Sequence, residues 1–385
     1  MLGTFTGTQY LDLNEVGHGE LDKAAGTVLA SVNDNRGTFL APEEEDNLYW
    51  NRYILDKKVS ADTSGLFTTD WYLKKVEHPD RPTTTTETGG ASSSLLYHTW
   101  RNGSDKWLQR MGDLRHQNGE PKGLWVRIKG DKIGHDGSYG FTNRYTTYQI
   151  GYDEANHRRD KREIQGAAFI YAKGDSTYGR GSGDNRETAI TLYSTELSTK
   201  DHYLDLVLKA GRLRNDFTVY DVKGRRISGK DTRNGVTLSG EYGRKKPLGK
   251  QWFVEPQTQL SLGYLQGSDY GMSNGTAVHN RGVRSAVGRI GFNLGRDLDS
   301  SRYFYLKANL LHEFGGYMRT SYTRGNDCTV ATERHNDTWL EWGAGLAMAL
   351  GKNRDNHLYF DVERSSGSSF KKDWQWNAGA RFTFR

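Results

Sequence analysis

The chain has 385 residues, a formal net charge of +6 and 26% charged residues. Its basic excess is spread evenly along the sequence, which argues against a nucleic-acid-binding protein. The single cysteine, Cys328, excludes an internal disulfide and a cysteine zinc site, and no stretch approaches the ~18–20 apolar residues of a membrane-spanning helix.

The same composition is compatible with a transmembrane β-barrel, because every second residue of such a strand faces a wet lumen. The 22 Tyr and 10 Trp suit the two membrane interfaces, and the 6 Pro are few enough for long strands. The first residues have neither a basic segment nor an apolar segment of the kind found in export signals. We therefore expect a fragment or a truncated gene product.

Residues 1–79 are predicted to form short strands separated by turns. The strands are expected at 27–32, 34–40, 50–55 and 68–75, and the acidic run Glu43–Asp46 is interpreted as a solvated loop. This segment is too short to close a large core alone. It is either a small β domain or the last rungs of a longer structure.

Residues 80–94 are interpreted as a linker, because their Thr, Ser and Gly provide almost no apolar surface for a core. Residues 95–117 are predicted to contain an amphipathic helix. Its apolar face consists of Leu96, Trp100, Trp107, Met111 and Leu114, and its polar face of Lys106, Arg110 and Asp113. Gly103 followed by Ser104 indicates that the helix is kinked or begins there.

Residues 118–385 change to a period of two and are predicted to form about twelve strands. We place these strands at 124–130, 143–152, 163–173, 186–196, 202–214, 232–242, 252–265, 279–293, 302–314, 338–350, 356–364 and 374–384. In the fifth strand, Leu204, Leu206 and Leu208 alternate with polar Asp205 and Lys209. These strands are longer than those of most soluble sandwiches.

The connections indicate which way the barrel is oriented. Long Gly- and charge-rich loops are predicted at 131–142, 174–185, 215–231, 266–278 and 315–337, and most of the connections between them are short. Long loops on one side and tight turns on the other are typical of outer-membrane barrels. An even strand count puts both barrel ends on the short-turn side, so the helix must cross the lumen.

The expected dimensions allow one helix inside. Twelve strands about 4.8 Å apart and tilted about 40° close at a backbone diameter of roughly 24 Å. Inward side chains narrow this to on the order of 12 Å, the width of one helix with its side chains. We expect the lumenal helix to present Trp107, Arg110, Met111, Gly112, Asp113, Leu114 and Arg115 to a wall that includes Arg127, Glu255, Gln257, Arg289, Glu313, Asp361 and Arg381.

Two short motifs and one group of side chains are candidates for a catalytic or ligand site. His312-Glu313 lacks the second histidine of a metalloprotease helix, and Gly179–Gly183 lacks the Lys-Ser/Thr of a phosphate loop. His135, Asp136, His279 and His335 could reach the long-loop rim and form a surface protease there, but sequence alone does not bring them together. We expect no metal and no cofactor.

Several segments, in order, resemble the translocator domain of type V autotransporters of the pertactin and adhesin type. The matching segments are 110–115 followed by 123–127, then 148–153, 203–205, 253–257, 288–291, 311–314 and 359–362. Residues 1–79, ending in Trp71-Tyr72-Leu73, resemble the final, autochaperone-like rungs of the secreted β-helical passenger.

The resemblance implies a monomeric barrel in the outer-membrane lipid that exports its own N-terminal passenger to the cell surface. It also implies barrel-assembly machinery and periplasmic chaperones as partners. These would recognise an aromatic signal on the last strand, Trp376, Phe382 and Phe384, although here Arg385 follows the usual aromatic end. The alternative function is a porin or diffusion channel with an N-terminal periplasmic domain.

Overall fold

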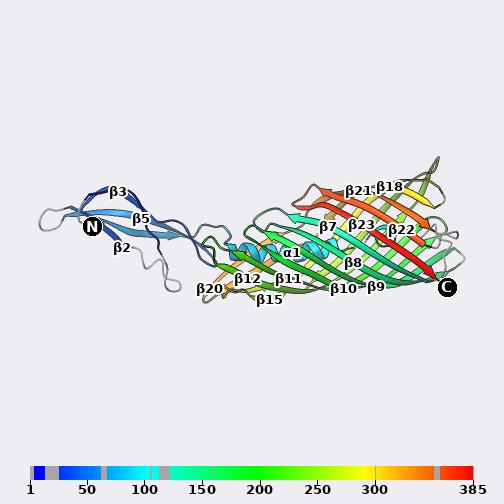
Figure 1. The fold of residues 1–385 in the computed structure, drawn as a ribbon, viewed down its shortest axis with the longest axis horizontal. Helices are drawn as coiled ribbons and strands as arrows, with labels where there is room; N and C mark the ends of the chain where they lie inside the picture. The colour runs from blue at the N-terminus through cyan, green and yellow to red at the C-terminus, as the bar shows by residue number, and fades with distance from the viewer. Residues whose placement is uncertain are drawn as a thin grey trace.

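The computed structural model describes residues 4–13, 26–61, 67–104, 106–111, 122–158, 160–299, 301–350 and 356–384. It shows a long β-barrel that contains helix α1 and is preceded by a smaller β-structure at the N-terminal end (Figure 1). Within these ranges, neither helix is both long enough and apolar enough to cross a lipid bilayer.

Twelve antiparallel strands close the barrel, as the period-two pattern predicted. In chain order they are β7 (Lys122–His135), β8 (Phe141–His157), β9 (Lys161–Tyr178), β10 (Gly181–Ser198), β11 (His202–Tyr220), β12 (Arg226–Arg244), β14 (Trp252–Leu265), β17 (Val283–Asp297), β18 (Arg302–Glu313), β21 (Thr338–Leu350), β22 (Asn356–Ser366) and β23 (Phe370–Phe384). A short strand, β13 (Lys246–Gly249), pairs with β14.

The barrel closes where the first strand pairs with the last. Lys122 at the start of β7 lies opposite Phe384 at the end of β23, and His135 lies opposite Phe370. Both ends of the barrel sequence therefore lie at the same rim, beside the short turns. The helices that precede β7 must reach this rim from the opposite side.

The barrel wall has an apolar outer face and a polar inner face. In β11, Leu204, Leu206 and Leu208 are 42–47% exposed, whereas Asp205 is 1% exposed. Exposed Leu, Ile and Phe side chains recur on the outside of the neighbouring strands. This outer face suits lipid, and an interior lined with charged groups suits a lumen that holds water or a polar segment.

The predicted long loops are largely wrong. Segments 174–185 and 215–231 continue the barrel strands into hairpins, while 266–278 and 315–337 contribute to a four-stranded sheet. Its strands are β15 (Ser268–Gly271), β16 (Ala277–Asn280), β19 (Tyr317–Arg324) and β20 (Asp327–Arg334). These segments resemble loops because they are rich in Gly and charged residues. Cross-strand bonds nevertheless satisfy their backbone, and Val278, Met318 and Tyr322 pack in the apolar cluster around α1.

The N-terminal part contains the four expected strands and two that were not predicted, at residues 4–10 and 44–45. They are β1 (Thr4–Tyr10), β2 (Val28–Val32), β3 (Asp34–Leu40), β4 (Glu44–Glu45), β5 (Trp50–Ala61) and β6 (Phe67–Glu77). β1 and β3 pair in parallel and in register, and Phe5 stacks on Phe39 with ring centres 4.6 Å apart. A small apolar core of Phe5, Val32, Phe39 and Trp71 holds these strands together.

Two helices link this part to the barrel, α1 (Thr84–Asn102) and α2 (Trp107–Met111). The helix was thus predicted in the right region, but its main part begins some twenty residues earlier than Ser104. Gly103 ends α1, and a second short helix follows it.

Candidate functional site

Helix α1 runs inside the barrel, where almost all of its residues are buried. It begins with a capping box, in which the Thr83 hydroxyl accepts from the Thr86 amide and the Thr86 hydroxyl accepts from the Thr83 amide. The interpretation of residues 80–94 as an unstructured linker is therefore wrong. Their small side chains suit a helix in a narrow tube rather than a flexible tether.

Small residues let the helix backbone approach Tyr322 of β19 and Tyr139 of the turn between β7 and β8. A Cβ atom on Gly89 would lie 2.5 Å from the ring of Tyr322, and one on Gly90 would lie 2.3 Å from the ring of Tyr139. Carbon atoms cannot approach so closely without displacement, since optimal contact is about 3.5–4.0 Å. Glycine at these two positions is therefore required by the seating of α1 in this structure.

The hydroxyl groups of α1 are satisfied by polar side chains of the wall. Asn215 donates to the Ser92 hydroxyl at 2.7 Å, and Arg233 donates to the Ser93 hydroxyl at 2.8 Å. Burial of such groups costs free energy unless they are paired. These contacts pair the polar groups of a Ser-rich helix, while its apolar side chains pack in a cluster with the surrounding strands: Ala91, Leu95, Leu96, Tyr97 and Trp100.

Larger side chains of α1 occupy the middle of the barrel. The Trp100 indole fills the space over two wall glycines, since Cβ atoms on Gly235 and Gly263 would lie 2.6 and 2.4 Å from it. The Tyr97 hydroxyl donates to Glu313 at 2.7 Å. The Arg101 guanidinium lies 4.6 Å from the ring centre of Trp339.

Helix α2 contacts the wall through charge, aromatic packing and backbone. Arg110 donates to Asp205 at 2.6 Å, and the Trp107 ring lies 4.4 Å from that of Tyr203. The Gln109 carbonyl accepts from Arg127 at 3.0 Å and from Asn377 at 2.9 Å. Strands on several sides of the barrel therefore hold this short helix.

A buried charge network joins the segment between the helices to the last strands. Lys106 lies 2.5 Å from Glu341 and 2.7 Å from Glu363. Three lysines and three carboxylates form this network, Lys106, Lys307, Lys372, Glu341, Asp361 and Glu363. Because the charges balance, the network avoids the large penalty of an unpaired buried charge.

The structure places all seven predicted wall residues inside the barrel: Arg127, Glu255, Gln257, Arg289, Glu313, Asp361 and Arg381 are 0–9% exposed. Three of them contact the helices directly: Arg127, Glu313 and Asp361. Arg381 instead pairs with Asp153 of β8, and Arg289 bonds Gln257, Gln259 and Asn309 within the wall.

Of the predicted helix residues, Trp107 and Arg110 are buried in the lumen. Met111 ends α2, while Gly112, Asp113, Leu114 and Arg115 lie outside the described residues. Asp205, the partner of Arg110, was not among the predicted wall residues. Its alternation with outward-facing leucines places it on the inner face, but sequence alone does not identify which inward carboxylate meets the helix.

The acidic run Glu43–Asp46 was interpreted as a solvated loop, and this is wrong. Glu45 is 2% exposed, and its carboxylate accepts from the Thr84 amide at the start of α1 and from the Val222 amide at 3.1 Å. Glu44 and Asp46 pair with Lys223 and Arg324. The run therefore closes over the barrel mouth and joins the N-terminal part, α1 and the hairpins.

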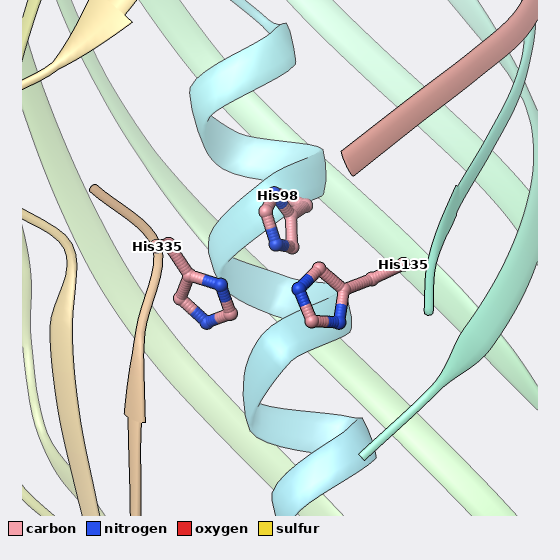
Figure 2. Close-up of side chains that lie close together, drawn as sticks. All are labelled: His98, His135 and His335. Atoms are coloured by element: carbon pink, nitrogen blue, oxygen red, sulfur yellow. The ribbon is translucent and has the colours of Figure 1, made fainter. Parts of the chain in front are cut away.

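Near the mouth, three buried histidines come together (Figure 2). His98 comes from α1, His135 from the end of β7, and His335 follows β20. One ring nitrogen of each lies within 4.8 Å of the others. His135 and His335 were predicted to reach the rim, but His98 was not, because the three residues are far apart in sequence.

The predicted alternative of a rim protease finds no support in this geometry. His279 lies apart from the cluster beside Asp269, and Asp136 pairs with Lys371. The Ser94 hydroxyl lies 3.2 Å from Nε2 of His335, but Glu333 contacts the same nitrogen, at 3.4 Å. A catalytic triad needs the carboxylate on the other ring nitrogen, where it orients the imidazole.

The predicted terminal signal lies on the outer face. Phe382 and Phe384 are 48% and 44% exposed, whereas Trp376 is only partly exposed. Phe384 lies beside Tyr152 of β8, with ring centres 6.3 Å apart. These aromatic groups form part of the outer rim at the short-turn end.

Little free space remains beside the helices. A cavity of about 50 Å³ adjoins Asn102, Ser104 and Lys106. This is room for a few water molecules, each of which needs about 10–15 Å³ by such a measure.

Comparison with known proteins gives consistent results. A family model described as the autotransporter β-domain matches residues 124–362. The pertactin autotransporter of Bordetella parapertussis is 32% identical over 304 residues, which cover 77% of this chain and 32% of that protein. The chain thus spans about a third of that relative's length.

Two solved structures share this architecture. The crystal structure of the β domain of the Bordetella autotransporter BrkA covers 69% of this chain and 100% of its own, with 25% identity and a TM-score of 0.56. The translocator domain of NalP from Neisseria meningitidis covers 77% of this chain and 99% of its own, with a TM-score of 0.59. At 14% identity, the NalP match supports the fold alone.

Proposed function

The chain belongs to the autotransporter β-domain family, and we propose that α1 and α2 form the lumenal linker that tethers the exported passenger to the barrel. The protein is an outer-membrane translocator that inserts as a β-barrel and exports its own N-terminal passenger to the cell surface. Residues 1–79 are proposed to be the end of that passenger. This function requires no catalytic group in the barrel.

One observation supports the tether above all. The chain passes from the N-terminal strands through the mouth at Thr83, along the lumen in α1 and α2, and reaches the opposite rim where Lys122 begins β7. If the passenger is exported through the barrel or together with it, the chain that joins passenger and barrel remains in the lumen. The two helices, held by polar contacts with the wall, also keep the pore filled after export.

We further propose that outward-facing Phe382 and Phe384 form part of the insertion signal read by the barrel-assembly machinery, after delivery by periplasmic chaperones. A monomer suffices for this function, since one chain closes the barrel without a free edge. The diffusion-channel alternative needs an open lumen, and the charge pairs around Lys106 and Arg110 fill it instead.

The test fuses an export signal and an epitope to the N-terminal end of the full chain. We expect the epitope to be reached by antibody on intact cells when the barrel is folded, as judged by heat-modifiable migration. A folded barrel with an epitope reached only after cell lysis would overturn the proposal. In planar bilayers, deletion of residues 84–111 should raise conductance, whereas equal conductance would favour the channel.

A further inference from the structure

We propose that His98, His135 and His335 form a binding site for a divalent transition metal ion such as Zn²⁺. The proposal goes beyond export, because it concerns a ligand of the finished barrel. The three side chains come from the helix, the first barrel strand and the segment after β20, and they face one another (Figure 2). A bound ion would connect all three elements.

The rings are arranged closely enough to share an ion. The centre of the His98 ring lies 5.1 Å from that of His135 and 4.5 Å from that of His335. Their ligand nitrogens lie within 4.8 Å of one another, whereas tetrahedral Zn²⁺ with Zn–N bonds of about 2.0–2.1 Å needs nitrogens about 3.3 Å apart. Small rotations of the histidine side chains would bring the nitrogens to the separation that Zn²⁺ needs.

Burial makes the cluster more than a chance grouping. The three residues are 1%, 7% and 1% exposed, in chain order. Neither ring nitrogen of His98 has a hydrogen-bond partner among the described residues. A buried polar group without a partner costs free energy, and metal coordination would satisfy one of these nitrogens.

A carboxylate is available as the fourth ligand. Glu333 oxygens lie 3.4 Å from Nδ1 of His135 and 3.4 Å from Nε2 of His335. Three imidazoles and one carboxylate suit Zn²⁺, and also Cu²⁺ or Ni²⁺.

The surroundings would exclude water and accept the added charge. His98 stacks on Phe370 with ring centres 5.0 Å apart, and His335 stacks on Tyr97 at 5.1 Å. The nearest helix cation, Arg101, lies 3.9 Å from Glu313, which offsets its charge. The cluster is therefore walled by aromatic rings, and Glu333 and Asp337 place negative charge near His135.

The test uses the full chain without a histidine tag, folded in detergent with ZnCl₂ and then separated from free metal. We expect about one Zn²⁺ per chain by elemental analysis, and a tetrahedral absorption spectrum with Co²⁺. His98→Phe fits the aromatic surroundings and should weaken binding on the order of tenfold or more. His279→Phe is the matched control, because His279 lies outside the cluster, and should bind like the wild type.

Heat-modifiable migration reports folding independently of metal. If His98→Phe does not fold, His335→Gln replaces it as the cluster variant, and its retained Zn²⁺ is measured in the same way. Failure of the folded wild type to retain Zn²⁺ and Co²⁺, or equal retention by the wild type and the folded cluster variant, would overturn the proposal. Surface display of the epitope tests export separately, so the two proposals can fail independently.

Discussion

Arg110 of α2 donates a hydrogen bond to Asp205 of β11 at 2.6 Å, and the two side chains are 0% and 1% exposed. The same guanidinium lies 4.4 Å from the ring centre of Tyr193. Breaking one side of a buried pair typically costs about 3–5 kcal/mol. This pair therefore controls how firmly α2 is seated, while the strands remain joined by their own hydrogen bonds.

Arg110→Glu should loosen the helix without unfolding the barrel, because it places two carboxylates together inside the lumen. We expect larger and noisier currents in planar bilayers, with heat-modifiable migration retained. The exchanged pair, Arg110→Asp with Asp205→Arg, should recover part of the low conductance. Wild-type conductance in the single variant would show that this pair does not hold the helix.

Gly89→Ala should destabilise the seated helix even though alanine favours helices by about 1 kcal/mol over glycine. The added carbon would lie 2.5 Å from the buried Tyr322 ring, and overpacking costs about 1–3 kcal/mol. Gly103→Ala is the control, since the closest atom to its Cβ would be the flexible end of Lys209, and the nearest backbone atom, the Trp100 carbonyl oxygen, would lie 3.2 Å away. Thermal unfolding in detergent should separate the two variants, and equal melting temperatures would contradict the close approach.

Glu45→Ala should release the first turn of α1 at the barrel mouth. The carboxylate accepts from the Thr84 amide, and loss of a capping acceptor costs about 0.5–2 kcal/mol. Hydrogen exchange of residues 84–86 should become faster. Glu43→Ala should leave this exchange unchanged, because Glu43 pairs with Arg52 and Arg81 rather than with the helix.

The rim of the barrel that includes the turn at Arg180, opposite the rim where Lys122 begins β7, should face the outside of the cell. Arg180 and Lys200 lie in the exposed turns at the two ends of β10. In a Cys328→Ser background, an impermeant thiol reagent should label Arg180→Cys on intact cells, and label Lys200→Cys only after lysis. The reverse pattern would invert the topology.

Phe382→Asp should reduce insertion by more than its direct cost in lipid. A charge near the membrane interface costs about 0–1 kcal/mol on the outer face of a barrel, so a larger loss reports recognition of the last strand. Phe360→Asp provides the comparison, because Phe360 is also outward-facing, at 47% exposed, but lies in β22. Equal loss of heat-modifiable barrel in both variants would argue against a terminal signal.

The barrel was predictable because its signal is local and repeated. Alternation such as Leu204-Asp205-Leu206 identifies a strand and its two faces at once, and the same rule placed Arg127 and Arg381 inside. The alternation rule could not specify which wall side chain contacts which helix side chain. The bond from Arg110 to Asp205 depends on how far the helix descends into the lumen, and no single segment encodes that depth.

The helix boundaries were harder, because composition was a poor guide in a polar lumen. Thr84–Ser94 looked like a linker since it lacks apolar residues, yet wall groups such as Asn215 and Arg233 satisfy its hydroxyls. For the same reason Glu45 resembled a solvated residue, although it caps α1. The meeting of His98 with His135 and His335 is a tertiary effect that spacing does not reveal.

The pairing of β7 with β23 also determines the order in which the lumen can be enclosed. Because Lys122 meets Phe384, the wall cannot become a tube until nearly the whole sequence is present, and bringing distant ends together is the slow, entropically costly part of assembly. Until then the sheet has an open side. A helix that precedes β7 in the chain can enter laterally through that opening, so α1 need not be threaded lengthwise through a finished pore.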